Sequence, residues 1–270
     1  MKTVYVGDCG VDDYSGKLYP GGCGLNVAYY TKQAGLKIDL VSCVGNDKNS
    51  NIPLNVVKKI HLDISHIHSL QGETAKQKIQ VLGNGEKKFI GYYPGVLSDF
   101  KLDLNDINFI NEHDVLVTLF YSQISHLFDQ ITKIKFSGLK VVDFMDGADF
   151  NKDINFVKKY ANWWDIGFFG LSGSDSNLIK DLLQLAKNLT KTVVITLGSG
   201  GSLAVAHNKI FKVKVKPVKA VDTTGCGDAY LAGFLSSWLK IKELKPAMKA
   251  GSELAIGVTQ HWGAINSKIE

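Results

Sequence analysis

Short hydrophobic runs alternate with amphipathic segments along most of the chain. The hydrophobic runs cover residues 2–8, 37–45, 114–120, 139–144, 165–170 and 192–198. Runs this short, separated by polar segments with helical periodicity, are typical of strands that are buried on both faces. Helical patterns cover residues 24–34 and 49–60, and Gly35 is well placed to end the first helix. The alternation predicts an α/β fold, a single domain over residues 1–270 with a mostly parallel sheet.

The region from residue 74 to residue 93 departs from this alternation. Residues 76–81 and 87–92 have the character of two strands, joined around Asn84 and Gly85, a pair that favours tight hairpin turns. Polar and hydrophobic residues alternate only loosely there, so the hairpin is not expected in the deep core. The pattern fits an edge excursion of the main sheet, which it slightly favours, or a small flap over the open end of the domain.

The amino-acid composition limits the kinds of ligand and partner that the protein is expected to bind. The chain has 45% hydrophobic and 21% charged residues, as ordinary globular proteins do. The net charge of +5 is spread along the chain, so nucleic acid is not an expected partner. All 31 basic residues are lysines. Because no guanidinium group is present, an anion must be bound by backbone N–H groups, lysine or a metal ion.

The four cysteines and the absence of long apolar segments indicate in which cellular compartment the protein is expected. The cysteines show no C-x-x-C spacing, which predicts reduced thiols in a reducing compartment. No segment reaches 18 consecutive apolar residues, and the first residues lack the apolar core of a secretion signal. From the sequence we expect a cytoplasmic protein that does not cross a membrane.

Residues 221–235, with the sequence VDTTGCGDAYLAGFL, carry the strongest chemical signal. Gly225, Cys226 and Gly227 precede a helical pattern that starts near residue 229. The first N–H groups of a helix lack intrahelical partners and attract anions, and glycines let a ligand approach the backbone closely. Asp228 would lie in the first helical turn, where a carboxylate also complements the helix dipole. An anion cradle beside a carboxylate and an ordinary helix start both fit this stretch in isolation.

Two further glycine-rich stretches leave alternatives open. In residues 20–30, PGGCGLNVAYY, Asn26 follows Gly21, Gly22 and Gly24 just before a helix. The stretch fits a turn capped by Asn26, or a polyol site in which the amide of Asn26 contacts hydroxyl groups. Residues 196–205, TLGSGGSLAV, fit a hairpin loop, although loops at the carboxyl ends of parallel strands also form ligand sites.

Carboxylates follow two of the predicted strands, and several enzyme motifs are absent. Asp8 and Asp12 come after the first strand, and Asp143 and Asp146 after the run at 139–144. Each could simply cap a helix or turn. Neither an H-E-x-x-H nor an H-x-H pattern is identified among the seven histidines, so a zinc site is not expected. The absence of G-x-S-x-G and G-x-x-x-x-G-K-[ST] argues against an α/β-hydrolase and a P-loop NTPase.

Taken together, these motifs resemble those of the ribokinase-like (PfkB) family of carbohydrate kinases. GGCGLN, a flap hairpin and TLGSGGS precede residues 222–228, which match the family's D-T-x-G-x-G-D signature, and the resemblance covers essentially the whole chain. Segments similar to fructoselysine 6-kinases lie at 62–68, 72–81, 89–100, 141–149 and 259–265. The resemblance implies a three-layer α/β/α sandwich with a small β-sheet lid from residues 11–20 and 74–93. It also implies ATP-dependent phosphorylation of a sugar hydroxyl, the 6-hydroxyl of a fructosamine such as fructoselysine.

The resemblance assigns roles residue by residue. Asp228 would be the catalytic base, with the N–H groups of Gly225, Cys226 and Gly227 as anion hole. The substrate-binding positions would be Asp12, Gly22, Asn26 and Tyr92. The nucleotide-binding positions would be Thr196, Gly198, Gly201 and Ala255. Asp222 matches a position that helps to order a monovalent-cation site.

ATP and Mg²⁺ are the implied cofactors, K⁺ is a further candidate ion, and lids of this type often pair two subunits into a homodimer. Ribose, fructose or a nucleoside as acceptor, or a sugar-binding protein without catalysis, are the alternatives. Two positions depart from the family pattern. Cys226 stands where alanine is usual, which we interpret as space filling rather than oxidant sensitivity, and the N-x-x-E motif linked to Mg²⁺ is not legible near residues 168–177.

Overall fold

The central layer of the computed structural model is a sheet of nine strands, within the residues that the structure describes, 1–83 and 86–266. Their spatial order is β13 (Lys209–Val213), β12 (Ser202–Ala206), β11 (Thr192–Thr196), β10 (Ile166–Gly170), β9 (Leu139–Asp143), β8 (Val115–Leu119), β1 (Thr3–Val6), β4 (Ile38–Gly45) and β5 (Ile67–Leu70). Every pair of neighbours from β11 to β5 is parallel, whereas β12 pairs antiparallel with both β11 and β13. The predicted mostly parallel sheet is confirmed.

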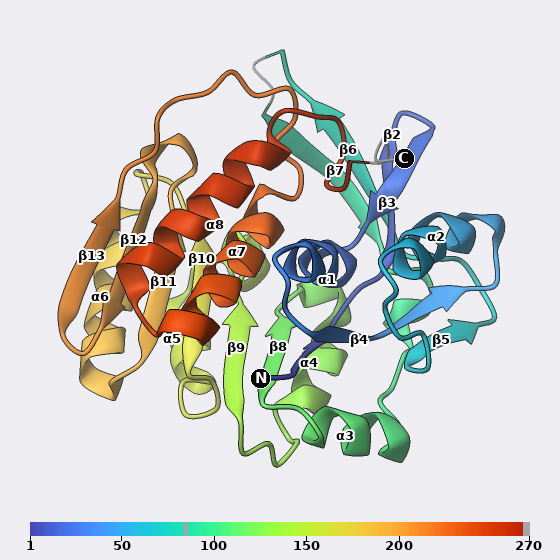
Figure 1. Ribbon diagram of the computed structural model, residues 1–270, viewed down its shortest axis with the longest axis horizontal. Coiled ribbons are helices and arrows are strands. Elements are labelled where there is room, and N and C mark those ends of the chain that lie inside the picture. Colours follow the sequence, from blue (N-terminus) through green and yellow to red (C-terminus); the bar gives the residue numbers. More distant parts are fainter. Residues whose placement is uncertain (84–85, 267–270) are drawn as a thin grey trace.

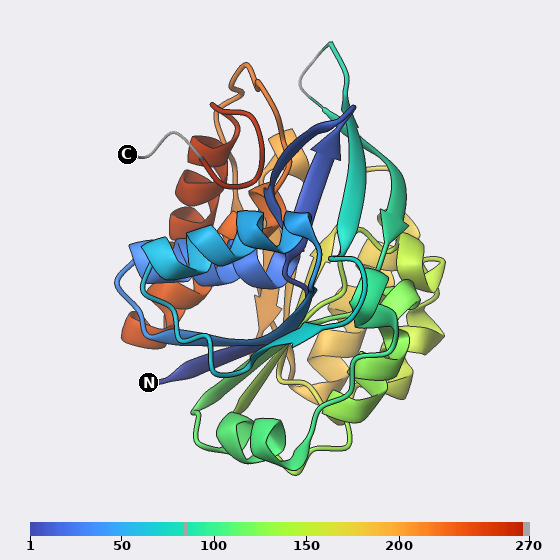
Figure 2. The ribbon, with the colours of Figure 1, turned by 90° about the vertical axis from the view of Figure 1, so that its right-hand side faces the viewer.

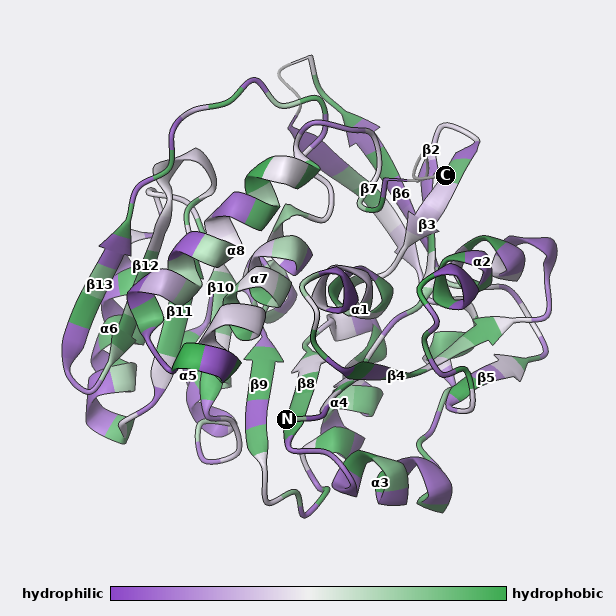
Figure 3. Ribbon diagram, viewed as in Figure 1, coloured by the Kyte–Doolittle hydropathy of each residue, from purple (hydrophilic) through white to green (hydrophobic). Residues whose placement is uncertain are grey.

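Helices cover both faces of this sheet, as Figures 1 and 2 show. One layer contains α1 (Cys23–Gln33), α2 (Asn51–Lys59), α7 (Cys226–Ile241) and α8 (Leu244–Val258). The other contains α3 (Leu104–Asn111), α4 (Ser125–Ile131), α5 (Ile154–Lys159) and α6 (Ser176–Leu189). In β1, Tyr5 faces the first layer while Val4 and Val6 face the second. Burial on both faces explains why the central strands are continuous hydrophobic runs, which are mostly green in Figure 3.

A second sheet, which we call the lid sheet, stands above the carboxyl ends of the central strands (Figure 2). Its order is β3 (Lys17–Gly21), β2 (Gly10–Tyr14), β6 (Lys76–Val81) and β7 (Lys87–Tyr93). Residues 76–93 thus pair with residues 10–21 and not with the edge of the main sheet, so the edge excursion that the pattern slightly favoured is wrong. The predicted turn at Asn84 and Gly85 lies outside the described residues.

The chain between β13 and α7 differs from the pattern in its sequence. Residues 212–221 alternate between apolar and polar types, yet β13 ends at Val213 and the chain continues as a loop along the open end of the sheet. Pro217 lacks the N–H that a ladder requires, which agrees with a loop. Helix α7 then begins after Gly225, which has φ of 80°. None of the helices in residues 1–83 and 86–266 is long and apolar enough to cross a membrane.

Candidate active site

One large cavity, of about 1050 Å³, lies between the lid sheet and the carboxyl ends of the central strands. It gathers nearly all of the predicted site residues: Asp12, Gly22, Asn26, Tyr92, Thr196, Gly198, Gly201, Gly225, Cys226, Gly227, Asp228 and Ala255. Asp222 is the exception, because it is fully buried behind the cavity wall. The parallel topology explains this convergence, since loops at the carboxyl ends of neighbouring strands meet at one edge of the sheet.

Asp228 and Asn26 form a hydrogen-bonded pair at the floor of this cavity. Asp228 lies in the first turn of α7 and is 6% exposed, and the Nδ2 group of Asn26, from α1, donates to its Oδ2 at 2.8 Å. Burial raises the pKa of Asp228, although the bonds from Asn26 and Cys23 and the charge of Lys87 lower it in part. A buried carboxylate with a raised pKa is suited to accept a proton from a substrate hydroxyl.

The hydrogen-bond partners of Asn26 exclude one of the two interpretations of its loop. The N-cap of α1 is Gly22, with no side-chain bond, so the interpretation of Asn26 as a cap is wrong. Its Oδ1 atom is buried without a hydrogen-bond partner, and so is the hydroxyl of Tyr92 from β7. Because buried polar atoms normally have partners, both atoms fit groups of a bound ligand. The ring of Tyr92 also contacts the ring of Tyr121, with the ring centroids 5.1 Å apart.

The glycines of residues 21–24 serve close packing within the protein. A Cβ atom at Gly24 would lie 2.6 Å from the backbone oxygen of Asp8, and one at Gly21 would lie 2.4 Å from the side chain of Asp12. Gly22 has φ of 95°, which favours glycine. These glycines therefore let α1 start against the end of β1, and this places Asn26 beside Asp228.

The segment before α7 has the geometry of an anion cradle. Gly225 takes the left-handed conformation, and a Cβ atom at Gly227 would meet no atom within 4 Å, so the space in front of this backbone is open. The helix dipole favours an anion there, although the N–H of Cys226 already donates to the oxygen of Thr223 at 3.3 Å. The Sγ atom of Cys226 lies 3.5 Å from the oxygen of Ala255, and burial raises its pKa to about 12. The side chain is therefore a neutral thiol, which agrees with space filling.

Asp222 ties together three parts of the chain behind the cradle. Its Oδ1 atom accepts from the N–H and the hydroxyl of Thr224, at 2.9 and 2.7 Å. Its Oδ2 atom accepts from the hydroxyl of Tyr14, in the lid sheet, at 2.7 Å and from the N–H of Gly263 at 2.9 Å. Both carboxylate oxygens are thus occupied by the protein's own donors, and Asp222 orders the loop that carries the cradle.

Further carboxylates gather in the same cavity. Burial raises the pKa of Asp8 to about 6 and that of Asp143 to about 7, and it raises the pKa of Asp12 well above the usual value. Their mutual repulsion and that of Asp228 add to the shifts, while Lys87 lowers the pKa of Asp12 and Asp143. Desolvated carboxylates of this kind gain stability from any cation that binds among them.

Several cavity residues were not singled out from the sequence. Lys87, at the start of β7, lines the cavity, and its N–H donates to the hydroxyl of Thr223 at 3.3 Å. Cys23 lines it beside Asn26, and five residues of the loop after β13 line it as well: Val215, Lys216, Pro217, Val218 and Ala220. For that loop, Pro217 inside an alternating run was a usable sequence signal against a strand. For Lys87 there was no such signal, since it is one of 31 lysines in the chain.

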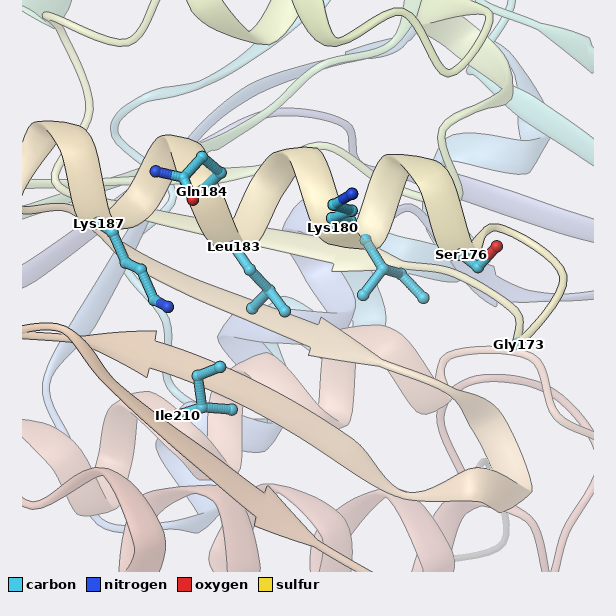
Figure 4. A pocket seen from close by; sticks show the side chains of 8 residues that line it. Gly173, Ser176, Lys180, Leu183, Gln184, Lys187 and Ile210 are labelled. Carbon is cyan, nitrogen blue, oxygen red and sulfur yellow. The ribbon is translucent and has the colours of Figure 1, made fainter.

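A smaller groove lies between α6 and β13 (Figure 4). Leu183 and Ile210 point into it, and the described residues that line it are Gly173, Ser176, Ile179, Lys180, Leu183, Gln184, Lys187 and Ile210. Its volume is about 360 Å³, and this lining includes no carboxylate. Without a proton acceptor, the groove does not compete with the large cavity as a catalytic site.

Comparison with known proteins agrees with the cavity's composition. The model of the pfkB family carbohydrate kinases matches residues 7–134 and 167–270. The chain belongs to this family. The pfkB match includes Asn26 and the whole of residues 222–228, so the paired Asn26 and Asp228 lie in family segments. The chain is therefore an ATP-dependent sugar kinase with the ribokinase fold.

Relatives cover nearly the full length of this pfkB chain. A fructoselysine 6-kinase of Shigella flexneri is 29% identical over 267 residues, which is 98% of this chain and 100% of the relative. Fructosamine kinase FrlD of Bacillus subtilis (strain 168) is 28% identical over 272 residues, 98% of this chain and 93% of the relative. The crystal structure of a ribokinase from Thermotoga maritima has a TM-score of 0.78 at 23% identity, covering 98% of this chain and 94% of that one.

Proposed function

We propose that this kinase transfers the γ-phosphoryl group of ATP to the 6-hydroxyl of a fructosamine such as fructoselysine. The Asn26–Asp228 pair carries the proposal. Asp228 can accept the hydroxyl proton, and the unpartnered Oδ1 of Asn26 offers a hydrogen-bond acceptor beside it. The acceptor class is supported by the charge of the cavity and by relatives described as fructoselysine 6-kinase and fructosamine kinase.

The proposed transfer needs few groups besides this pair. The hydroxyl oxygen of the acceptor attacks the γ-phosphorus. The bond between the γ-phosphorus and the bridging oxygen of ADP breaks, and the hydroxyl proton moves to Asp228. The N–H groups at the start of α7 would stabilise the equatorial oxygens of the phosphoryl group. With no arginine in the chain, Lys87, one of three lysines among the described residues that line the cavity, is our candidate for the remaining positive charge.

The nucleotide would lie along the β11 side of the cavity. Thr196, Gly198 and Gly201 would contact ATP there, and Ala255 with the loop after β13 would form the wall against adenine. Gly201 is required by packing, since a Cβ atom would lie 2.1 Å from the oxygen of Val213. This close approach brings the glycine-rich loop and the end of β13 into one wall.

The donor set of the cavity fits a divalent ion. Asp143, the last residue of β9, and Asp146, three residues later, line the cavity and supply the hard oxygen atoms that Mg²⁺ prefers. The raised pKa of Asp143 means that its ionised form would gain from a bound cation. When bound, Mg²⁺ neutralises charge on the nucleotide phosphates. For K⁺, we propose that Asp222 orders the surrounding loop and is not itself a ligand, because its own oxygens are already occupied.

The carboxylates on the lid side of the cavity favour a cationic acceptor. Asp8 and Asp12 are 5% and 4% exposed, and burial raises the pKa of each. A fructosamine carries a protonated amine next to its sugar, whereas ribose, fructose and nucleosides are neutral. A buried carboxylate that pairs with this ammonium group would be relieved of part of its desolvation penalty. A neutral sugar offers only hydroxyl groups.

The acceptor class can be tested by its dependence on pH. We expect kcat/KM for fructoselysine to exceed that for fructose at least tenfold near pH 8, in an ADP-release assay that also includes psicoselysine, glucoselysine, ribose and a nucleoside. The ratio should fall as the pH drops through about 6, where Asp8 becomes protonated. Protonation of Asp228 affects every acceptor and cancels in the ratio.

Asp12→Asn provides the second arm of this test, because it keeps the shape of the side chain and removes its charge. We expect the preference for fructoselysine over fructose to decrease, with turnover of fructose largely kept. An equal loss for both acceptors would contradict amine recognition while leaving the kinase assignment intact. Ligand binding without any ADP release would instead favour a sugar-binding protein without catalysis.

The lid contact through Tyr14 leads to a separate prediction. Tyr14→Phe removes the hydrogen bond that its hydroxyl donates to Asp222 at 2.7 Å and the contact of this hydroxyl with Oγ1 of Thr224 at 2.9 Å. A hydrogen bond to a charged group contributes about 1.5–3 kcal/mol, so we expect the KM for the acceptor to rise roughly tenfold or more. Hydrolysis of ATP without acceptor should also increase, because closure of the lid excludes water.

Tyr93→Phe is the matched control for Tyr14→Phe, since Tyr93 lies on the same lid sheet and is 48% exposed. Unchanged KM and unchanged ATP hydrolysis in Tyr14→Phe would show that this contact does not hold the lid.

Pairing of two copies through the lid stays a prediction. The exposed apolar side chains of Phe89 and Ile90 on edge strand β7 suit such pairing, and sedimentation would measure it.

A further inference from the structure

Two histidines and an aspartate meet at the edge of the central sheet, away from the catalytic cavity. His66 and His68 flank Ile67 at the start of β5, and Asp106 belongs to α3. The Nδ1 atom of His66 lies 2.8 Å from Oδ1 of Asp106, and the Nε2 atom of His68 lies 3.0 Å from the same oxygen. None of the three lines the cavity that holds Asp228.

Strand geometry explains why both imidazoles reach one carboxylate. Successive side chains of a strand point to opposite faces, so residues two apart share a face. Ile67 accordingly points into the hydrophobic core, whereas His66 and His68 face α3. The expectation that the histidines form no H-x-H pattern is wrong, since residues 66–68 have the sequence H-I-H.

Asp106 is held in place by the start of its helix. Its N–H donates to Oδ1 of Asp103 at 2.8 Å, and its own Oδ2 accepts from the N–H of Asp103 at 3.1 Å. The Asp106 side chain is fully buried. Burial alone raises the pKa of Asp106, but the hydrogen bonds from His66 and His68 outweigh it, so the pKa is lowered and the carboxyl is ionised at neutral pH.

The two imidazoles are held by aromatic rings and remain open to solvent. His66 stacks on Phe109, with ring centroids 3.9 Å apart, and His68 contacts Phe100 at 5.3 Å. Their side chains are 16% and 30% exposed. An ion could therefore reach the nitrogen atoms from solvent, while the ring planes would lose little freedom on binding.

The spacing of these atoms suits a transition-metal ion. In the protein alone, each imidazole directs one N–H at the Asp106 carboxylate. A divalent cation could bind once each ring carries its proton on the other ring nitrogen, which leaves the lone pair of the facing nitrogen to the metal. The three candidate ligand atoms lie within 4.8 Å of one another. Zn²⁺ bonds of about 2.0–2.2 Å in a tetrahedral site put ligand atoms about 3.4 Å apart. The two imidazole–carboxylate distances of 2.8 and 3.0 Å would open by a few tenths of an ångström, and the two imidazole nitrogens would come to a similar separation.

We propose that His66, His68 and Asp106 form a site for a divalent transition-metal ion of the zinc class, completed by water. Two imidazoles and a carboxylate are ligands that Zn²⁺ accepts, whereas Mg²⁺ prefers oxygen alone. The ion would join the edge strand β5 to α3. Its role is structural, and phosphoryl transfer does not depend on it.

The site can be tested by titrating the full-length protein, treated with a chelator and then freed of it, with Zn²⁺ in a calorimeter. We expect saturable binding at a site that Mg²⁺ in excess does not occupy, together with a rise in Tm that depends on Zn²⁺ concentration. Free cysteines, of which the protein has four, can also take up zinc, so variants must identify the site. His68→Gln and the His66→Gln/His68→Gln double variant should each lose one equivalent of binding and the associated Tm shift.

His207→Gln is the matched control, because it removes an exposed histidine from the turn between β12 and β13. It should keep both the binding and the Tm shift. Co²⁺ gives an independent readout: its visible spectrum should show ligand-field bands without thiolate charge transfer, and these bands should disappear in His68→Gln. Unaltered Zn²⁺ binding in folded His68→Gln, or no Zn²⁺ binding besides that of the cysteines, would overturn the proposal.

Discussion

Asp228→Asn is expected to lower kcat by about 10²–10⁴-fold, the usual range for loss of a positioned general base. Asparagine keeps the size of the side chain and can still accept the bond from Asn26, but it cannot take up the proton of the acceptor hydroxyl. The measurement is ADP release under saturating ATP and acceptor. Because the acceptor site and the nucleotide loop are unchanged, the KM values should change much less than kcat.

The same variant has a predicted effect on stability. Asp228 has a raised pKa in the folded protein, so it favours folding fully only below its unfolded pKa, and that contribution is lost as the pH rises through the folded pKa. At pH 7 the ionised carboxylate therefore weakens the fold, and Asp228→Asn should have a Tm equal to or above that of the parent. Loss of activity together with a higher Tm is the pattern of a strained catalytic group.

Asp181→Asn, on the exposed face of α6, is the control for loss of a carboxylate, and it should change neither kcat nor Tm. If Asp228→Asn kept substantial turnover while remaining folded, the assignment of the base would be wrong. A folded Asp228→Asn protein that no longer bound ATP would point instead to a role in the cradle itself.

The elements of the fold were predictable because their signals are local. The hydrophobic runs became strands with boundaries shifted by a few residues, and the helical patterns at 24–34 and 49–60 became α1 and α2. The glycines also predicted where the chain turns, since Gly22 and Gly225 both have positive φ. The pairing of residues 76–93 was predicted wrongly, because their partner strand at residues 10–14 could not be read from residues 76–93 alone.

The geometry of the site depends on contacts that no local pattern contains. Asp222 is bonded to Tyr14, 208 residues earlier in the chain, and Asn26 is bonded to Asp228 across 202 residues. Asp143 resembled a turn residue, and its Oδ1 does accept from the N–H of Met145 at 2.8 Å. What the sequence could not show is that burial and neighbouring carboxylates raise its pKa, because these depend on how the strands are ordered in the sheet.

Gly225→Ala is expected to lower both activity and stability. At φ of 80° an alanine costs about 1–2 kcal/mol relative to glycine, and its Cβ atom would lie 2.6 Å from that of Ala264. The loop must therefore shift, and the N–H groups at the start of α7 would no longer point at the transferred phosphoryl group. Loss of one such donor typically lowers kcat by about 10²–10³-fold, so kcat should fall by at least 10² and Tm should decrease as well.

Gly227→Ala separates the anion cradle from mere packing of the loop. A methyl group there meets no protein atom within 4 Å, so Tm should stay near that of the parent, yet the group would occupy the space in front of the cradle. We therefore expect kcat/KM for ATP to fall strongly in a stable protein. Gly257→Ala, an exposed helix position in α8 that is equally open, should change neither kinetic parameter. The added methyl group contacts no protein atom, so it can affect the kinetics only by contact with a bound ligand. Normal kinetics in Gly227→Ala would therefore show that the phosphoryl group does not approach this backbone.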